Sequence, residues 1–338
     1  MTAVAPIGQA VSMLAASTPD TGRIPVTIIG GYLGAGKTTL VNRILREAEG
    51  VRYAVLVNDF GALQIDAELI ESSDGDTLNL ANGCICCSLA GGFVEALHSV
   101  LARPHLPDRV VIEASGVSDP VAIAQYAHLP GFQLDGVIVL ADAETVRRRS
   151  TDKYVGRHVV QQVRGADLLV LNKIDLVTAE QLAAVRDWLT ATAPEARLLE
   201  AANAVIPAAV LFGLGARPHG PVHTATQAAH DHVTWSFTTG VPLDGDQVRA
   251  VLTALPAGVV RAKGVVHLAE DPATRFVAQV VGARATITPA GFWTDAEPAT
   301  KLVFIGVPRD GDADDEAMER TLRALADAQV PADDEGTT

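Results

Sequence analysis

Residues 24–40 read IPVTIIGGYLGAGKTTL, and their pattern indicates the class of fold. An apolar run that is typical of a buried strand passes into a glycine-rich segment and then into a helical pattern. Gly31, Gly36, Lys37 and Thr38 fit G-x-x-x-x-G-K-[ST], the phosphate-binding loop (P-loop), in the strand-to-helix context that this motif requires. The stretch therefore predicts an α/β domain that carries a nucleotide phosphate site.

The chemistry of this loop indicates a nucleoside triphosphate bound with Mg²⁺. Glycines let successive backbone N–H groups turn toward the phosphates. We expect Lys37 to act on the β- and γ-phosphates during hydrolysis and the Thr38 hydroxyl to ligate Mg²⁺. The nucleotide-binding residues predicted here are Gly31, Gly34, Ala35, Gly36, Lys37, Thr38 and Thr39.

A second nucleotide element is expected at the end of another strand, in RVVIEASGVSDP, residues 109–120. Glu113 follows a mostly apolar run, so its carboxylate can hold Mg²⁺ through water or polarise the attacking water. We expect the backbone N–H of Gly116 to approach the γ-phosphate. Taken alone, this stretch also fits a buried strand that ends in a surface carboxylate.

Base choice is predicted from LLVLNKIDLV, residues 168–177. The Asp175 carboxylate can accept hydrogen bonds from guanine N1–H and N2–H₂, whereas adenine presents an acceptor at N1, so the site favours GTP over ATP. We expect Lys173 to lie across the base and Asn172 to brace the loop. An ATP-dependent small-molecule kinase also begins with a P-loop, and the Asn172–Asp175 string argues against that alternative.

Five apolar runs predict a doubly wound, mostly parallel sheet, because continuous apolar strands are typical of sheets covered on both faces. They are residues 26–29, 53–57, 109–113, 136–140 and 168–171. We therefore assign residues 1–23 to a flexible tail, 24–205 to the P-loop domain and 206–232 to a histidine-containing linker.

Residues 233–330 predict a smaller C-terminal α+β domain with its helices on one sheet face. The predicted strands are 233–237, 259–268, 276–281 and 302–307, with room for one more, and the predicted helices are 244–255 and 314–328. No apolar run reaches membrane-spanning length, and the first 23 residues lack the pattern of a signal peptide.

Charge and hydropathy exclude two classes of binding partner. The formal net charge of −14 argues against nucleic acid as a partner, and the absence of a membrane segment argues against a membrane. The 48% hydrophobic content is that of a globular chain. Its acidity suits a cytoplasmic location, which we expect.

All three cysteines, Cys84, Cys86 and Cys87, lie in LANGCICCSL, residues 80–89. An odd count with no other cysteine cannot give a disulfide framework, so a reducing compartment and a metal or reactive thiol are favoured over simple space-filling. Three clustered thiols suit Zn²⁺ or Co²⁺, and Cu(I) is chemically possible. An apolar periodicity after Ser88 predicts a helix, whose N-terminus would favour the thiolate form.

Histidines in the linker are a further metal-ligand hypothesis. His219, His223, His230 and His232 lie in HGPVHTATQAAHDH, and we take His230 and His232 as candidate ligands. A polar flexible loop explains the same composition equally well.

The chain resembles the CobW-type P-loop GTPases, a family of metallochaperones. The matching stretches span about residues 24–307 and are GGYLGAGKTTL, VNDFGALQIDAELI, LANGCICCSL, EASGVSDP, LNKIDL and VVRAKGVVHL. The resemblance implies GTP-dependent metal handling, with the metal held by the cysteines and by acidic residues of the neighbouring segment. Asp59 is implied as a ligand of Mg²⁺ or of the metal, and as a catalytic residue beside Lys37 and Glu113.

One departure from the family concerns that acidic segment. Zinc-assigned members carry NEFGE, whereas here Ala62 stands in place of the last glutamate and the first acid is Asp59. Asp66 and Glu68 are nearby candidates. The departure leaves metal identity and coordination number open.

The leading hypothesis is a GTP-hydrolysing metallochaperone that delivers a divalent transition metal to a client metalloprotein, with a homo-oligomer possible. A metal buffer or sensor whose nucleotide only controls assembly is the alternative.

Overall fold

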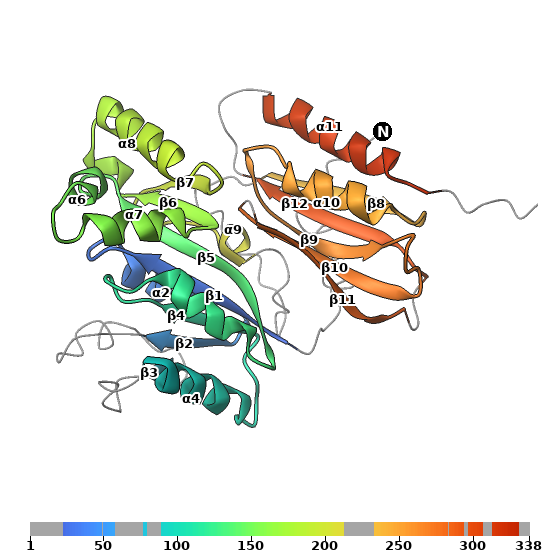
Figure 1. Ribbon diagram of the computed structural model, residues 1–338, viewed down its shortest axis with the longest axis horizontal. Coiled ribbons are helices and arrows are strands. Elements are labelled where there is room, and N and C mark those ends of the chain that lie inside the picture. The colour runs from blue at the N-terminus through green and yellow to red at the C-terminus, as the bar shows by residue number, and fades with distance from the viewer. Residues whose placement is uncertain are drawn as a thin grey trace, which may run out of the picture. The chain divides into compact units, whose positions relative to one another are not determined.

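A computed structural model describes residues 23–48, 50–57, 77–79, 89–212, 233–282, 284–293, 297–306 and 313–330. The described residues form two compact units, the first ending at Phe212 and the second beginning at Val233 (Figure 1). Within this described part, no helix has the length and apolar character needed to cross a lipid bilayer.

The first unit is built on a seven-stranded parallel sheet, which confirms the predicted α/β class. Its order is β3-β2-β4-β1-β5-β6-β7. The strands that follow β1 in the chain lie first on one side of it (β2, β3 and β4) and then on the other (β5, β6 and β7). Sheets of this kind bind their ligands at this switch of side, beyond the carboxyl ends of the strands. The strands are β1 (Ile24–Gly31), β2 (Tyr53–Val57), β3 (Thr77–Asn79), β4 (Arg109–Glu113), β5 (Phe132–Asp142), β6 (Leu168–Asn172) and β7 (Arg197–Ala201).

Helices connect these strands and cover the sheet (Figure 1). Every residue of β2, β4 and β6 is buried, as their apolar runs predict. The helical elements are α2 (Lys37–Arg46), α4 (Leu89–Leu101), α5 (Pro120–Ala124), η1 (Gln125–His128), α6 (Val146–Ser150), α7 (Gly156–Arg164), η2 (Ile174–Leu176), α8 (Ala179–Thr192) and α9 (Ala208–Phe212).

The helix α9 lies inside the range for which the sequence predicts a linker. Its Val210, Leu211 and Phe212 are buried, which is why the chain stays on the first unit to residue 212. The buried Arg109 at the start of β4 donates from Nη2 to the Phe212 carbonyl at 2.9 Å. The same guanidinium lies 5.2 Å from the Phe212 ring centroid and 3.4 Å from Asp135 Oδ2. The Pro- and Ala-rich composition conceals this short apolar segment.

The second unit is a five-stranded antiparallel sheet of order β11-β10-β9-β12-β8. Its strands are β8 (Val233–Thr239), β9 (Val259–His267), β10 (Thr274–Val281), β11 (Arg284–Phe292) and β12 (Thr300–Gly306), and its helices are α10 (Gly245–Thr253) and α11 (Ala313–Asp327). Val248 and Leu252 of α10 and Met318 and Leu325 of α11 share one apolar core with this sheet. This is the α+β arrangement that the sequence predicts, with β11 as the additional strand.

Candidate functional site

The P-loop joins β1 to α2 through glycines in conformations that other residues rarely adopt. Gly31, Gly34 and Gly36 have φ values of 134°, 82° and 102°. A Cβ at Gly31 would lie 2.4 Å from the Leu140 carbonyl oxygen, and one at Gly36 would lie 2.5 Å from Asn172 Nδ2. Glycine is therefore required at both positions, for backbone conformation and for close approach.

The N-terminus of α2 is open to an anion. Gly36 is its N-cap and offers no side-chain hydrogen bond to the helix, and no acidic residue lies in the first turn. The first N–H groups and the positive end of the helix dipole therefore point toward the loop. Lys37, at the start of this helix, is 8% exposed and adds a cation at the same place.

Two predicted Mg²⁺ ligands converge beside the P-loop. The Thr38 hydroxyl donates to Glu113 Oε1 at 2.8 Å, across 75 positions of sequence. The contact forms because β1 and β4 pair in register, Ile29 with Glu113. Glu113 is only 3% exposed, so this carboxylate belongs to the interior of the site rather than to the surface.

The loop after β4 lies against the P-loop. A Cβ at Gly116 would come within 2.8 Å of the Leu33 backbone nitrogen, so glycine permits this approach. On the other side, Gln162 Nε2 of α7 donates to the carbonyl oxygens of Gly116 and Ser118 at 3.1 and 2.7 Å. The Gly116 loop is thus held between the P-loop and α7.

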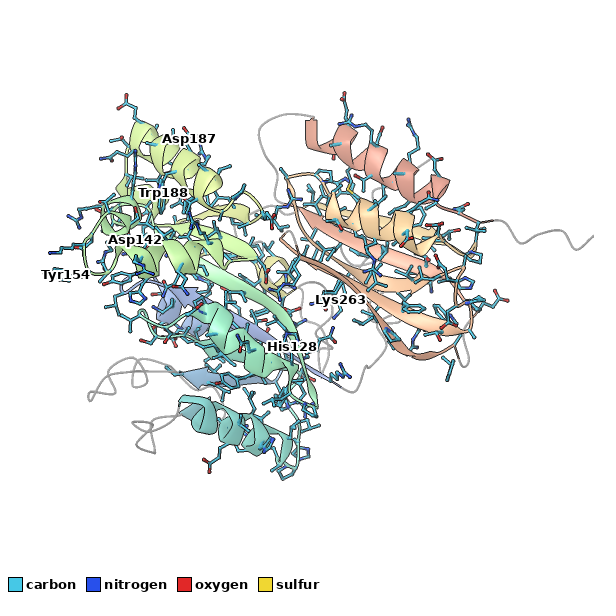
Figure 2. The ribbon with its side chains drawn as sticks, viewed as in Figure 1. His128, Asp142, Tyr154, Asp187, Trp188 and Lys263 are labelled. Atoms are coloured by element: carbon cyan, nitrogen blue, oxygen red, sulfur yellow. The ribbon has the colours of Figure 1, made fainter. Side chains whose placement is uncertain are left out.

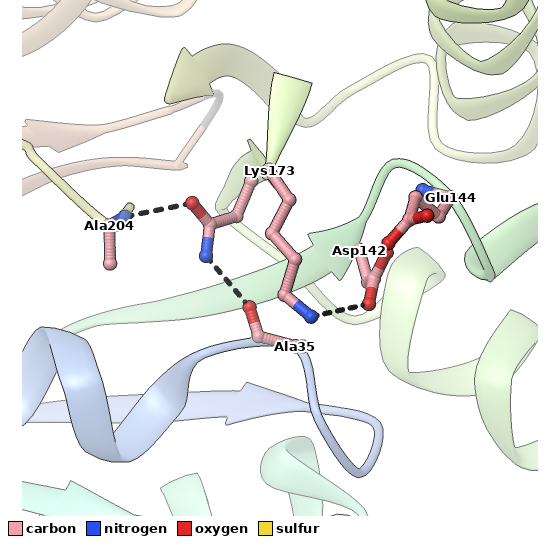
Figure 3. Close-up of polar contacts among 6 residues, drawn as sticks. Ala35, Asp142, Glu144, Lys173 and Ala204 are labelled. Atoms are coloured by element: carbon pink, nitrogen blue, oxygen red, sulfur yellow. Dashed lines mark hydrogen bonds and ion pairs between the residues drawn. The ribbon is translucent and has the colours of Figure 1, made fainter. Parts of the chain in front are cut away.

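Asn172, at the end of β6, joins two loops (Figure 3). Its Nδ2 donates to the Ala35 carbonyl at 2.9 Å, and its Oδ1 accepts from the Ala204 backbone N–H at 2.8 Å. The side chain is 2% exposed. These contacts are those of a residue that braces the P-loop against the loop after β7.

Lys173 and Asp142 form an ion pair next to Asn172 (Figure 3). Lys173 Nζ lies 2.8 Å from Asp142 Oδ2, and the other carboxylate oxygen accepts from the Glu144 backbone N–H at 2.9 Å. Asp142 ends β5 and pairs in register with Asn172. The pair holds the aliphatic stem of Lys173 along this edge, while Asp175 in η2 is exposed to solvent.

The carboxyl ends of β1, β4, β5 and β6 thus bring the predicted nucleotide residues to one edge of the sheet. Sequence reasoning missed three residues that support them, Asp142, Gln162 and Ala204. Asp142 carries a recognisable signal, since it is an acid at the end of an apolar strand. Gln162 and Ala204 carry none, because their contacts are long-range.

The predicted ligands of the transition metal lie outside the described residues. They are Cys84, Cys86, Cys87, Asp59, His230 and His232, together with the nearby Asp66 and Glu68. Within the ranges that the structure describes, there is no group of three or more His, Cys, Asp or Glu arranged to hold a metal ion.

Each of the two units matches a known protein-family model. Residues 25–200 match the model of the CobW/HypB/UreG nucleotide-binding domain. The chain belongs to the CobW/HypB/UreG family. Its second unit, over residues 232–326, matches the cobalamin synthesis protein cobW C-terminal domain. The CobW-type resemblance drawn from the sequence motifs is therefore confirmed.

Individual relatives within the CobW/HypB/UreG family span nearly the whole chain. A protein named zinc chaperone CobW from Sinorhizobium sp is 31% identical and covers 90% of this chain and 98% of its own length. A zinc-regulated GTPase metalloprotein activator 1 from Dictyostelium discoideum is 26% identical, over 82% of this chain and 70% of its own. Among solved structures, the Zn(II)-bound YjiA GTPase from Escherichia coli is 24% identical, with a TM-score of 0.44, over 91% of this chain and 99% of that one.

Proposed function

We infer that this chain is a GTP-hydrolysing metallochaperone that carries Zn²⁺ as cargo to a client metalloprotein. One observation carries the proposal. The P-loop, the Thr38–Glu113 contact and the Asn172–Lys173 segment lie together at one edge of the sheet. Family membership supports it, since the relatives are named as zinc chaperones and as a zinc-regulated GTPase.

The phosphate part of the site fits a nucleotide by its shape and charge. The cradle depends on the positive φ values of Gly31, Gly34 and Gly36 and on the close approach of other groups at Gly31 and Gly36. The N-cap Gly36 has no side chain to bond the first N–H groups of α2. Phosphate oxygens supply the acceptors that these donors need. Lys37 adds a positive charge at the same end of the helix, and its role is to stabilise charge on the transferred phosphoryl group.

The Mg²⁺ part fits by donor type. The Thr38 hydroxyl and the Glu113 carboxylate are hard oxygen ligands 2.8 Å apart, which suit Mg²⁺ and its bound waters. When bound, Mg²⁺ neutralises charge on the β- and γ-phosphates. In this proposal Glu113 also orients the attacking water, and the Gly116 backbone N–H approaches the γ-phosphate.

The base part favours guanine. We assign base reading to Asp175, whose exposed carboxylate is available to a ligand, and we assign the stem of Lys173 to the base face. ATP at this place would leave the carboxylate facing the adenine N1 lone pair. The preference for GTP therefore separates this proposal from an ATP-dependent kinase.

The cargo site is assigned to Cys84, Cys86 and Cys87, with Asp59 and His230 and His232 as further candidate ligands. Thiolates suit Zn²⁺, and Co²⁺ is the second candidate by the same chemistry. Three thiols held reduced are consistent with a cytoplasmic site of action.

Two measurements test the proposal. Competition of GTP and ATP for the purified chain tests base choice, and equal affinity for both would contradict it. Metal affinity with a non-hydrolysable GTP analogue, compared with GDP, tests the chaperone role, because cargo release requires the nucleotide state to change metal affinity. Equal metal affinities in both states would leave a metal buffer as the better description.

A further inference from the structure

The segment from Arg147 to Arg164 carries a charge opposite to that of the chain. It holds six Lys or Arg residues and one acid, Asp152, whereas the whole chain has a net charge of −14. The remainder of the chain is therefore near −19, since the segment contributes +5. An approaching acidic molecule is repelled by most of this protein and attracted here.

Within the part of the chain that the structure describes, none of these cations forms an ion pair with an acid. The acid of this segment, Asp152, bonds to the backbone of the turn between α6 and α7. Its Oδ1 accepts hydrogen bonds from the N–H groups of Tyr154 and Val155 at 2.8 and 3.1 Å. The Tyr154 hydrogen bond, and then that of Val155, holds the pKa of this carboxyl below its usual value, so it stays ionised and bound to the backbone. Lys153, Arg157 and Arg164 are exposed.

A pocket lies at the centre of this charge. It has a volume of about 410 Å³ and is lined by Ser150, Gly156, Arg157, Val160, Gln161 and Arg164. Arg157, Val160, Gln161 and Arg164 recur at helical spacing, so they form one stripe of α7, in which Val160 is half-buried and the other three residues are exposed. We call this stripe with Ser150 the α7 surface. Tyr154, 82% exposed, projects from the adjoining turn (Figure 2).

The residue types suit a protein partner. Arg and Tyr are enriched at the cores of protein interfaces, and Arg binds carboxylates through two parallel N–H groups. A nucleic acid, in contrast, requires a broad basic surface, and here the basic segment is short within a strongly acidic chain. The favoured occupant is therefore an acidic segment of a protein.

The same helix holds the Gly116 loop. Gln161, which lines the pocket, donates from Nε2 to Asp119 Oδ2 at 2.7 Å, and Asp119 is the N-cap of α5. The next residue, Gln162, holds the carbonyl oxygens of Gly116 and Ser118 from the buried side of α7. A carboxylate in the pocket competes with Asp119 for the Gln161 amide. Occupation of the pocket therefore acts on the loop that approaches the P-loop.

A second contact links the segment to the P-loop. The Arg149 guanidinium lies 4.7 Å from the ring centroid of Tyr32, within the P-loop.

We propose that the α7 surface is a docking site for an acidic segment of a partner protein, and that docking changes the GTPase reaction through the Gly116 loop. This docking rests on the nucleotide site but not on metal delivery. Its binding test below uses GDP and no metal, so its failure would leave the proposed cargo function standing.

Binding is measured by fluorescence anisotropy with a labelled deca-glutamate peptide on the full chain with GDP. We expect R157E/R164E to weaken binding at least about tenfold, since each exposed pair is modest and both are reversed in sign. The matched control R249E/R323E makes the same charge change on exposed helix positions of the second unit and should stay within about twofold of wild type. Equal losses in the two variants, or no loss in R157E/R164E, would overturn the proposal.

Further measurements decide the occupant and the coupling. We expect deca-glutamate to change the GTP hydrolysis rate of wild type at least twofold and to leave that of R157E/R164E at its basal, wild-type value; an unchanged wild-type rate would overturn the coupling. Tighter binding of a 12-nucleotide single-stranded DNA than of the peptide at the same surface would overturn the choice of protein. Self-association of wild type that R157E/R164E abolishes in sedimentation would identify a second copy as the occupant instead.

Discussion

Asn172→Asp is the substitution that most directly tests how the nucleotide edge is assembled. It retains the volume of the side chain and the acceptor that receives the Ala204 N–H at 2.8 Å. It removes the donor that reaches the Ala35 carbonyl at 2.9 Å, and an ionised carboxylate would place two acceptors against each other there. The side chain is 2% exposed, so water cannot replace the lost donor.

The expected loss of stability follows from one buried carbonyl left without its donor. Such a group costs about 1–3 kcal/mol, and burial of a carboxylate adds to this cost. A folded unit has about 5–15 kcal/mol of stability, so the variant should fold. About 2–4 °C of melting temperature is lost for each kcal/mol in a unit of this size. We also expect weaker GTP binding, because the P-loop loses its brace.

The pH dependence separates this mechanism from general damage. Burial against the Ala35 carbonyl raises the folded-state pKa of the introduced carboxyl above its unfolded value, and the protonated form can donate to that carbonyl. The stability due to this donor is therefore present below the unfolded pKa and is lost as pH rises through the folded pKa. The measurement is thermal unfolding of N172D at pH 5 and pH 8.

The matched control is N203D, which makes the same chemical change at an exposed position of the neighbouring loop. N172D should recover stability at pH 5 relative to pH 8 by more than N203D or wild type does. The bracing role of Asn172 is refuted if N172D has the same melting temperature as N203D at pH 8. It is also refuted if the melting temperature of N172D depends on pH no more than that of N203D.

Three further predictions concern the ligands. Asp175→Asn should weaken GTP binding about ten- to a hundredfold in calorimetry, with unchanged metal binding, because only the base-reading carboxylate is lost; unchanged GTP affinity would contradict guanine reading. Lys37→Ala should abolish phosphate release from GTP while circular dichroism stays that of wild type, and retained hydrolysis would exclude the assigned role of Lys37. Replacement of Cys84, Cys86 and Cys87 by Ser should remove the difference in Zn²⁺ affinity between the GTP-analogue and GDP states, for which a tenfold difference corresponds to ~1.4 kcal/mol; persistence of the difference would place the cargo elsewhere.

The fold was predictable because its signals are local. The five apolar runs are the central strands of the first sheet, and their unbroken hydrophobicity already indicates burial on both faces. The short strand Thr77–Asn79 and the strand Arg197–Ala201 were not foreseen. The first is too short for any period to show, and in the second the charged Arg197 and Glu200 interrupt the apolar pattern.

The nucleotide site was predictable only in part. The P-loop glycines follow from a motif whose spacing encodes the geometry. The role of Gln162 could not be predicted in this way. Its amide donates to the carbonyl oxygens of Gly116 and Ser118, which lie 46 and 44 positions away in sequence, and nothing in the local pattern indicates these contacts. Residues that hold a loop from another element become visible only when the packing is known.

Backbone strain identifies the same edge by an independent route. Among the described residues, the non-glycine positions with positive φ are Lys173, Asn203 and Ala204, at 64°, 50° and 52°. Each costs about 1 kcal/mol or more for an L-residue, so the surrounding contacts must hold it there. For Ala204 the holding contact is its N–H bond to Asn172, and for Lys173 it is the ion pair with Asp142. Asn172, which holds Ala204, also donates to the Ala35 carbonyl of the P-loop. The strained positions therefore lie where the P-loop meets the segment predicted to read the base.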